Sequence, residues 1–302
     1  MNKRILFVDE DTGRTGSTVS MEYLITGFQE RGFEVFVLSS KDDPVILARL
    51  SKVSTVLNAR TGPMKSLALS THFTMRFHPL SWEGITTIAK DGLRFLLGIA
   101  VVLRAIRTTR AQLVYANEHT VPQASVAAWI RNIPAVMHIR SRMVSRVAGI
   151  RRYVLSRVIV QCNRAIIAIT AREAEQLQAR PRSRANINVV GEFISRPGLA
   201  EYDLAGCRSA FGLFPAKRIV SMLGGIQDIK GSLEFLQAAE IVAASRTDVQ
   251  FVIAGMNYCE TPERKAYYDR CMEIVARLEQ RGLIRMLGEV LDPLKLLAAS
   301  DI

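Results

Sequence analysis

The sequence has few residues that could cross-link the chain or hold a metal. Its 302 residues include four cysteines, and no two of them are spaced as C-x-x-C. A long chain with so few scattered thiols is not typical of a disulfide framework or a zinc site. His72, His78 and His119 show no metal-ligand spacing. We therefore expect free thiols, a reducing compartment and no bound metal.

Long apolar runs are also absent. The longest, Phe95–Leu103, lies between Arg94 and Arg104 and falls far short of the roughly 20 residues that cross a bilayer. The N-terminal run Ile5–Val8 is followed at once by Asp9-Glu10-Asp11, which is not typical of a signal peptide. The sequence thus predicts a cytoplasmic protein and restricts any membrane contact to a peripheral one.

Acidic residues are scarce in the middle of the chain. The formal net charge is +12, and residues 131–200 hold 13 Arg against 3 Glu. Such a patch favours an anionic partner: phosphate, nucleic acid or acidic lipid. Aromatic residues near it are too few for base stacking, so nucleic acid is not expected. We predict a helix over Arg140–Arg164, either a solvated basic face over a packed core or a surface that docks on anionic lipid.

Apolar β-rich runs alternate with helical stretches along the chain, which predicts parallel strands joined by right-handed crossovers. The length favours two domains, divided within the stretch Gly191–Phe214 into residues 1–195 and 196–302. In the first domain we predict strands at Ile5–Asp9, Phe33–Ser39, Leu113–Tyr115, Ala135–Ile139, Ala165–Ile169 and Ile187–Val190, and helices at Ser17–Arg31 and Pro122–Arg131. In the second we predict strands at Arg218–Leu223, Val249–Ala254 and Ile284–Leu287, and helices at Ser232–Ser245, Glu263–Arg281 and Pro293–Ala299.

Two glycine-containing loops lie between a predicted strand and a predicted helix. The first, Gly13–Ser17, would present free N–H groups at a helix N-terminus to an anion; the alternative is a plain turn. The second, Gly224–Gly231, adds Lys230 beside a helix start, where a cation and N–H groups can hold a diphosphate. The alternative there is a solvated lysine. Neither loop is the G-x-G-x-x-G of a nicotinamide dehydrogenase, which disfavours that class.

Several motifs in order resemble the GT-B glycosyltransferases of family 4. That family has a strand, G-R-x-x-x-x-K-G, a helix and a strand ending in glycine, which Gly224–Gly231 and Val249–Gly255 resemble. The resemblance covers nearly the whole chain. Its other segments are Gln112–Asn117, Ile133–His138, Ala165–Thr170, Ile284–Val290 and Leu296–Ile302.

The resemblance implies retaining transfer of a sugar from a nucleotide-sugar donor, without metal or other cofactor, in a cleft between two Rossmann-like doubly wound α/β domains. Residues 1–195 would be the acceptor-side domain and residues 196–302 the nucleotide-sugar-binding domain. His138 would face the sugar at the reaction centre; the alternative is a structural histidine. The donor side would comprise Gly16, Ser17, Gly225, Lys230, Gly255 and Gly288, with Lys230 on the diphosphate. Asn117, His119 and Arg140 are assigned to the acceptor side, which the segment Asn117-Glu118-His119 would line.

Two departures from the family pattern limit this expectation. The arginine that follows the first glycine in the family is Gly225 here, and the later E-x7-E block of the family would fall after Ile302. We therefore expect a C-terminally truncated, incomplete second domain and little or no activity. The main hypothesis is an enzyme of envelope polysaccharide biosynthesis on the inner face of the plasma membrane, with a saccharide or lipid-linked acceptor. The alternatives are a non-catalytic nucleotide-sugar-binding remnant and a basic membrane adaptor.

Overall fold

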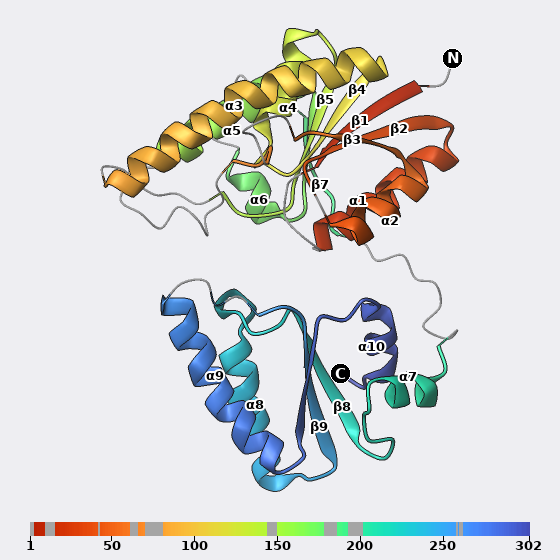
Figure 1. The fold of residues 1–302 in the computed structure, drawn as a ribbon, viewed down its shortest axis with the longest axis vertical. Coiled ribbons are helices and arrows are strands. Elements are labelled where there is room, and N and C mark those ends of the chain that lie inside the picture. Colours follow the sequence, from red (N-terminus) through yellow and green to blue (C-terminus); the bar gives the residue numbers. More distant parts are fainter. Residues whose placement is uncertain are drawn as a thin grey trace. The chain divides into compact units, whose positions relative to one another are not determined.

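The computed structural model describes residues 3–9, 16–41, 43–60, 66–69, 81–143, 150–177, 186–192, 202–257, 259 and 262–302. The chain divides into two compact units, Met1–Ser195 and Arg196–Ile302, at the same boundary as in the sequence analysis. In each unit, helices lie on both faces of a parallel sheet (Figure 1). The predicted α/β class with Rossmann-like domains is confirmed.

Unit 1 contains a sheet of seven strands in the order β3-β2-β1-β4-β5-β6-β7, and all neighbouring pairs are parallel. The strands are β1 (Lys3–Asp9), β2 (Phe33–Ser39), β3 (Thr55–Asn58), β4 (Leu113–Asn117), β5 (Ala135–Ile139), β6 (Ala165–Ala168) and β7 (Asn186–Val189). The strand order reverses between β1 and β4. In an open α/β sheet, ligands bind at the carboxyl ends of the strands on such a switch point.

Helices cover both faces of this sheet (Figure 1). They are α1 (Gly16–Glu30), α2 (Pro44–Val53), α3 (Trp82–Thr109), α4 (Pro122–Ile130), α5 (Ile150–Cys162) and α6 (Ala171–Glu175). Strand β1 shows why two layers are needed: Ile5 and Phe7 pack in the core with α1 and α2, while Leu6 and Val8 pack in the core with α3, α4 and α5. Successive side chains of a strand point to opposite faces, so a strand that is apolar throughout requires cover on both.

Unit 2 contains a parallel sheet of three strands in the order β10-β9-β8. Its elements are α7 (Leu204–Ala210), β8 (Arg218–Leu223), the 3-10 turn η3 (Asp228–Lys230), α8 (Ser232–Ser245), β9 (Val249–Ala254), α9 (Pro262–Gln280), β10 (Ile284–Gly288) and α10 (Pro293–Ala299). All six residues of the central strand β9 are buried. Helices α8 and α9 pack in one core, and α7 and α10 pack in the other.

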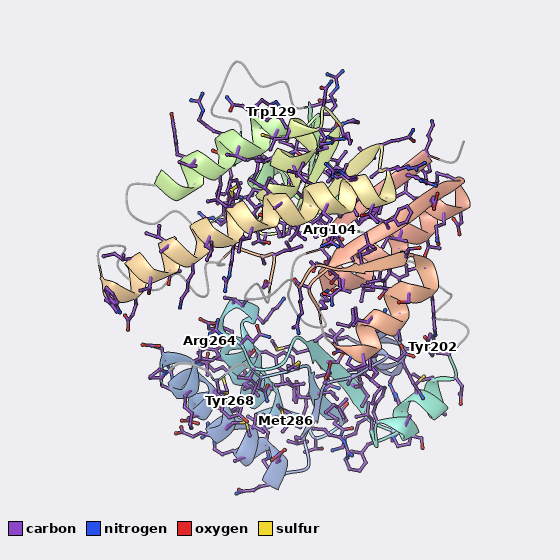
Figure 2. The ribbon with its side chains drawn as sticks, turned by 45° about the horizontal axis from the view of Figure 1, so that its top comes forward. Arg104, Trp129, Tyr202, Arg264, Tyr268 and Met286 are labelled. Atoms are coloured by element: carbon purple, nitrogen blue, oxygen red, sulfur yellow. The ribbon has the colours of Figure 1, made fainter. Side chains whose placement is uncertain are left out.

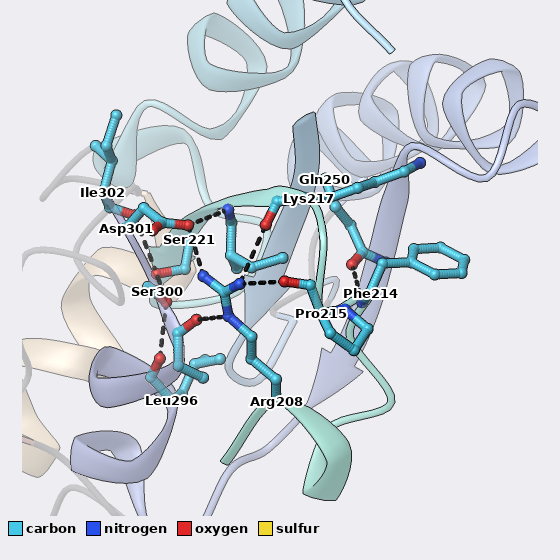
Figure 3. Close-up of polar contacts among 12 residues, drawn as sticks. Arg208, Phe214, Pro215, Lys217, Ser221, Gln250, Leu296, Ser300, Asp301 and Ile302 are labelled. Carbon is cyan, nitrogen blue, oxygen red and sulfur yellow. Dashed lines mark hydrogen bonds and ion pairs between the residues drawn. The ribbon is translucent and has the colours of Figure 1, made fainter. Parts of the chain in front are cut away.

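A buried arginine ties the beginning of unit 2 to its last residues (Figure 3). Arg208 donates to the carbonyls of Ala299, Pro215 and Lys217 at 2.7–3.3 Å and to Asp301 Oδ2 at 2.7 Å. These contacts, which we name the Arg208 clasp, supply the partners that a buried guanidinium requires.

The last two residues lie along β8. Ile302 N donates to Ile219 O at 3.2 Å, and Ser221 N donates to Ile302 O at 2.8 Å. This is the bonding pattern of a parallel ladder. The free edge of β8 is therefore paired at this point.

Most predicted elements are confirmed with small shifts of their ends, but three predictions need correction. Elements α2, β3, α3 and α6 were not predicted. The helix expected over Arg140–Arg164 begins only at Ile150; residues 140–143 are not helical, and 144–149 lie outside the described residues. The predicted interdomain stretch contains α7. The four cysteines are free thiols, and no helix in the described ranges is long and apolar enough to cross a membrane.

Candidate functional site

Buried polar side chains gather at the carboxyl edge of the sheet in unit 1. The strands are apolar along their length and end in Asp9 on β1 and Asn117 on β4, while His138 and Arg140 lie at the end of β5. The register sets Asp9 beside Asn117, and Asn117 beside His138. The structure therefore brings together Asn117, His138 and Arg140, three of the residues that the sequence analysis singled out, at the topological switch point.

An ion pair that the sequence analysis missed lies at the centre of this edge. Lys41 Nζ lies 2.9 Å from Asp9 Oδ2 and donates to Thr18 Oγ1 at 2.6 Å, and both charged side chains are almost fully buried. Asn117 Nδ2 donates to Asp9 Oδ1 at 3.3 Å. Burial raises the pKa of Asp9, and the Lys41 charge opposes that shift. The pair fixes β1, the end of β2 and α1 relative to one another.

Arg140 is held along one side and has an unpartnered group on the other. Its Nε donates to Asn117 Oδ1 at 3.0 Å, and its Nη1 contacts the carboxylate of Glu192, which also accepts from Ser20 Oγ at 2.8 Å. The side chain is 5% exposed, and the buried Nη2 has no hydrogen-bond partner within the described part of the chain. A buried guanidinium nitrogen without an acceptor is costly, so Nη2 is available to an oxygen of a ligand.

His138 has the same incomplete bonding. Its Nδ1 lies 2.7 Å from Tyr115 Oη, while no described residue offers a hydrogen-bond partner to its buried Nε2. Burial, reinforced by the charge of Arg140, lowers the pKa of His138 to about 3, and burial raises the pKa of Tyr115. Both side chains are therefore neutral near pH 7. A neutral imidazole with one free nitrogen can bond a hydroxyl group without adding charge.

His119 is buried and is held by its neighbour Glu118, the middle residue of the segment expected to line the acceptor side. The Glu118 carboxylate accepts from His119 N at 2.7 Å, contacts His119 Nδ1 and accepts from Arg140 N at 3.2 Å. The φ of Glu118 is +122°, a conformation that non-glycine residues rarely adopt. Glu118 thus fixes the turn after β4 and the first residue after β5, and no sequence pattern would have shown this.

Helix α1 begins at Gly16, followed by Ser17. The φ of Gly16 is not positive, and a Cβ at this position would meet no atom within 4 Å. The local backbone therefore does not require glycine. The rest of the predicted loop, residues 10–15, lies outside the described residues, so the donor-side role of Gly16 and Ser17 stays a prediction.

Two glycine turns cross closely at the carboxyl edge of unit 2. Gly225, with φ +68°, follows β8, and its Cβ would lie 2.2 Å from Met256 O; Gly255, with φ +131°, follows β9, and its Cβ would lie 2.4 Å from Gly225 N. Gly224 N and Gly225 N both donate to Ala254 O, at 2.7 and 2.9 Å. The crossing of the two backbones therefore accounts for Gly225 and Gly255 without a ligand.

Lys230 lies where this crossing meets the start of α8. A Cβ on Gly224 would lie 3.4 Å from Lys230 Cγ, so the aliphatic stem runs back along the end of β8. Lys230 is exposed, and no carboxylate in the described part of the chain pairs with it. Helix α8, with 14 residues, adds the partial positive charge of its N-terminus. An unpaired cation at a helix start suits a diphosphate.

The glycine crossing gives a direct stability prediction. Gly288 also has a positive φ, of +64°, but a Cβ there would meet nothing within 4 Å. We expect Gly288→Ala to cost about 1 kcal/mol from its φ alone, and Gly225→Ala to cost roughly 3 kcal/mol or more because the backbone must also move. Urea unfolding of the two variants would measure this difference. Equal losses of unfolding free energy in the two variants would show that the two turns can move apart at little cost.

Comparison with known proteins agrees with this architecture. Residues 15–191 match the model of the glycosyl transferase 4-like domain, which is more than half of the chain. The chain belongs to the glycosyl transferase 4-like family. No curated protein matches the sequence significantly. The assignment of the family therefore rests on unit 1, which contains His138 and Arg140.

Solved structures of the GT-B type have the same fold as this member of the glycosyl transferase 4-like family. HepE from Anabaena, in complex with UDP, is similar with a TM-score of 0.67 and 15% identity, covering 99% of this chain and 72% of that one. A glycosyltransferase from Rickettsia africae has a TM-score of 0.69 and 13% identity, covering 99% and 72%. Sucrose-phosphate synthase from Thermosynechococcus elongatus has a TM-score of 0.61 and 15% identity, covering 99% and 73%.

The glycine at position 225 has a structural reason in this member of the glycosyl transferase 4-like family. The GT-B pattern used in the sequence analysis has arginine there, but a side chain on this backbone would meet Met256 O. The second cation expected beside the diphosphate therefore cannot come from position 225 while the two turns cross in this way. Lys230 is the basic residue that remains in that loop.

Proposed function

We propose that the protein transfers a sugar from a nucleotide-sugar donor to a saccharide or lipid-linked acceptor, with retention of configuration at the anomeric carbon. We propose that this reaction belongs to envelope polysaccharide biosynthesis and takes place on the inner face of the plasma membrane. UDP is our first choice of nucleotide, because HepE, with the same fold, was solved with UDP and with UDP-glucose.

The observation that carries the proposal is Lys230 at the start of α8. When the bond between the anomeric carbon and the diphosphate oxygen breaks, negative charge grows on the leaving diphosphate. The Lys230 ammonium and the N-terminus of α8 would stabilise that charge. No metal is needed in this scheme.

Unit 1 supports the proposal through two unpartnered atoms at the carboxyl edge of its sheet. His138 Nε2 and Arg140 Nη2 are buried and have no hydrogen-bond partner among the described residues, and sugar hydroxyl groups would supply them. Because His138 stays neutral, we assign it to hydroxyl recognition and not to proton transfer. Asn117 and Glu192 hold Arg140 in place for the same contact.

The proposal is tested by turnover with nucleotide sugars. The protein would be incubated with UDP-, GDP- and ADP-linked hexoses and candidate acceptors, and products would be followed by mass spectrometry. The anomeric configuration of a product, read by NMR, decides between retention and inversion. Tight binding of a nucleotide sugar without any product would favour the alternative, a non-catalytic binding remnant, for which Gly225 in place of arginine is the specific observation.

The low pKa of His138 predicts how stability depends on pH. The folded-state pKa of about 3 lies below the ordinary 6.5, so the unfolded chain takes up the proton first. Native stability should therefore fall as the pH drops from about 6.5 towards 3. Urea unfolding between pH 7 and pH 4 should show a smaller loss for His138→Gln than for the parent protein. An identical loss would mean that His138 is protonated in the folded state.

A further inference from the structure

Helix α3 exposes apolar side chains on the side that faces away from the core. Its contacts with the core come mainly from the second half, through Gly98, Val102, Ala105, Ile106 and Thr109. Six large apolar side chains between Trp82 and Leu97 are exposed: Trp82, Ile85, Ile88, Leu93, Leu96 and Leu97. Helices that only cover a sheet carry polar residues on their outer face. This arrangement is therefore the reverse of an ordinary surface helix.

The exposed residues form one stripe. At 100° per residue, Trp82, Ile85, Leu93 and Leu96 lie on the same side of the helix, and their exposed fractions are 79, 49, 56 and 66%. The helix has 28 residues and is about 42 Å long at 1.5 Å per residue. The stripe itself, from Trp82 to Leu96, is about 21 Å long at 1.5 Å per residue, and an exposed apolar stripe of this kind marks an interaction surface.

Basic residues accompany the stripe. Lys90, Arg104 and Arg107 are exposed on α3, and Figure 2 shows Arg104 on this helix together with Trp129 on the neighbouring α4. Trp129 is 62% exposed. Between residues 81 and 164 the chain has 13 Lys and Arg and only 3 Asp and Glu. The region therefore combines apolar side chains that can enter an acyl layer with positive charges that attract phosphate head groups.

The charge decides between the two partners that an apolar helix face could have. In a symmetric antiparallel pair centred on the stripe, Lys90 of one copy would approach Lys90 of the other, and their repulsion would oppose the contact. An anionic lipid surface has the opposite charge and accepts the apolar stripe at the same time. A helix lying in the interface buries its apolar face while its basic residues stay at the head groups.

We propose that α3 is a membrane-docking helix, and that its stripe of Trp82, Ile85, Leu93 and Leu96 enters an anionic bilayer while Lys90, Arg104 and Arg107 contact the lipid phosphates. This inference rests on the proposed function and deepens it, since it assigns a membrane-facing surface to a protein whose proposed acceptors include lipid-linked ones. Docking needs no cofactor and no sugar transfer.

Flotation with vesicles tests the proposal without measuring catalysis. The protein should float with vesicles of phosphatidylcholine mixed with phosphatidylglycerol, and much less with phosphatidylcholine alone. The double variant Leu93→Glu, Leu96→Glu should lower the partition coefficient about a hundredfold, because each leucine contributes roughly a factor of ten. Arg104→Gln with Arg107→Gln should lower it roughly fivefold per charge, with a larger effect at low salt.

Matched control variants are available in unit 2. Ile241 on α8 is 74% exposed, and Arg270 on α9 is also exposed; Ile241→Glu and Arg270→Gln should leave flotation unchanged. Circular dichroism would check folding, and calorimetry with UDP would check unit 2 separately from docking. Flotation that is equal for the α3 variants and the parent protein overturns the proposal. A change of oligomeric state in light scattering, without a change in flotation, overturns it in favour of a second copy.

Discussion

Replacing Lys230 by alanine should lower the rate of sugar transfer by about 100- to 1000-fold, the size of effect seen when one preorganised group that stabilises developing charge is removed. Lys230 is the residue of the Gly224–Gly231 loop whose cation can reach a diphosphate beside α8. The affinity for UDP should fall as well, because the ground-state diphosphate already carries charge. Initial rates and calorimetry with UDP would measure the two effects.

Two control variants distinguish the effect of losing the lysine charge from an effect on the structure of the loop. Lys230→Arg keeps the cation and should recover much of the affinity for UDP. Lys265 is an exposed lysine on α9, paired with Asp269 at 2.7 Å, so Lys265→Ala should change neither turnover nor affinity. If Lys230→Ala binds UDP as tightly as the parent protein, the assignment of the diphosphate to this loop is wrong.

Replacing Lys41 by methionine should lower the free energy of unfolding by about 3–5 kcal/mol, because the buried carboxylate of Asp9 would lose the cation that pairs with it. Asp9 is 0% exposed, and Lys41 Nζ is its cation at 2.9 Å. Methionine fills a similar volume, so little of the effect would come from a cavity. Urea unfolding followed by circular dichroism would measure it.

The pH dependence of this loss identifies its cause. Burial already raises the pKa of Asp9, and without Lys41 the pKa should rise further. A carboxyl with a raised folded-state pKa binds its proton more tightly in the native state, so stability falls as pH rises from the ordinary 3.8 through the folded-state value. The deficit of Lys41→Met should therefore shrink in acid. Asp9→Asn in the Lys41→Met background should restore much of the stability, and a further loss there would refute the charge argument.

Where the chain follows local rules, the sequence predicted the fold well. Helix α8 runs from Ser232 to Ser245 and β9 from Val249 to Ala254, as expected from a glycine before a helix and an apolar run before Gly255. Helix α2 was missed although Asp43 caps it, with Oδ1 accepting from Val45 N at 2.9 Å. Asp-Pro before an apolar stretch is a signal for the start of a helix, so α2 could have been predicted from the sequence.

Other features depend on contacts between distant residues. From the sequence alone Lys41 is expected at the surface, but the fold buries it beside Asp9. The sequence after β5 predicts a helix. In the structure, Glu118 Oε2 accepts from Arg140 N, and Asn117 accepts from the Arg140 side chain. These two hydrogen bonds keep the chain extended at this point. Helix α3 escaped prediction because its apolar residues lie on two sides and blur the 3.6-residue period. Among the assigned site residues, the structure juxtaposes His138, Asn117 and Arg140 in unit 1, whereas their roles towards a substrate stay predictions.

The Arg208 clasp sets an order of events during synthesis on the ribosome. Residues as late as Ala299 and Asp301 are needed before the guanidinium of Arg208 has its partners. The sheet of the first unit needs nothing beyond Val189, so it can be complete while the second unit is still being made. Until residue 301 emerges, α7 has a charged group that it cannot bury. We expect a nascent chain arrested before Asp301 to be cut by a protease near α7 while the first unit stays resistant.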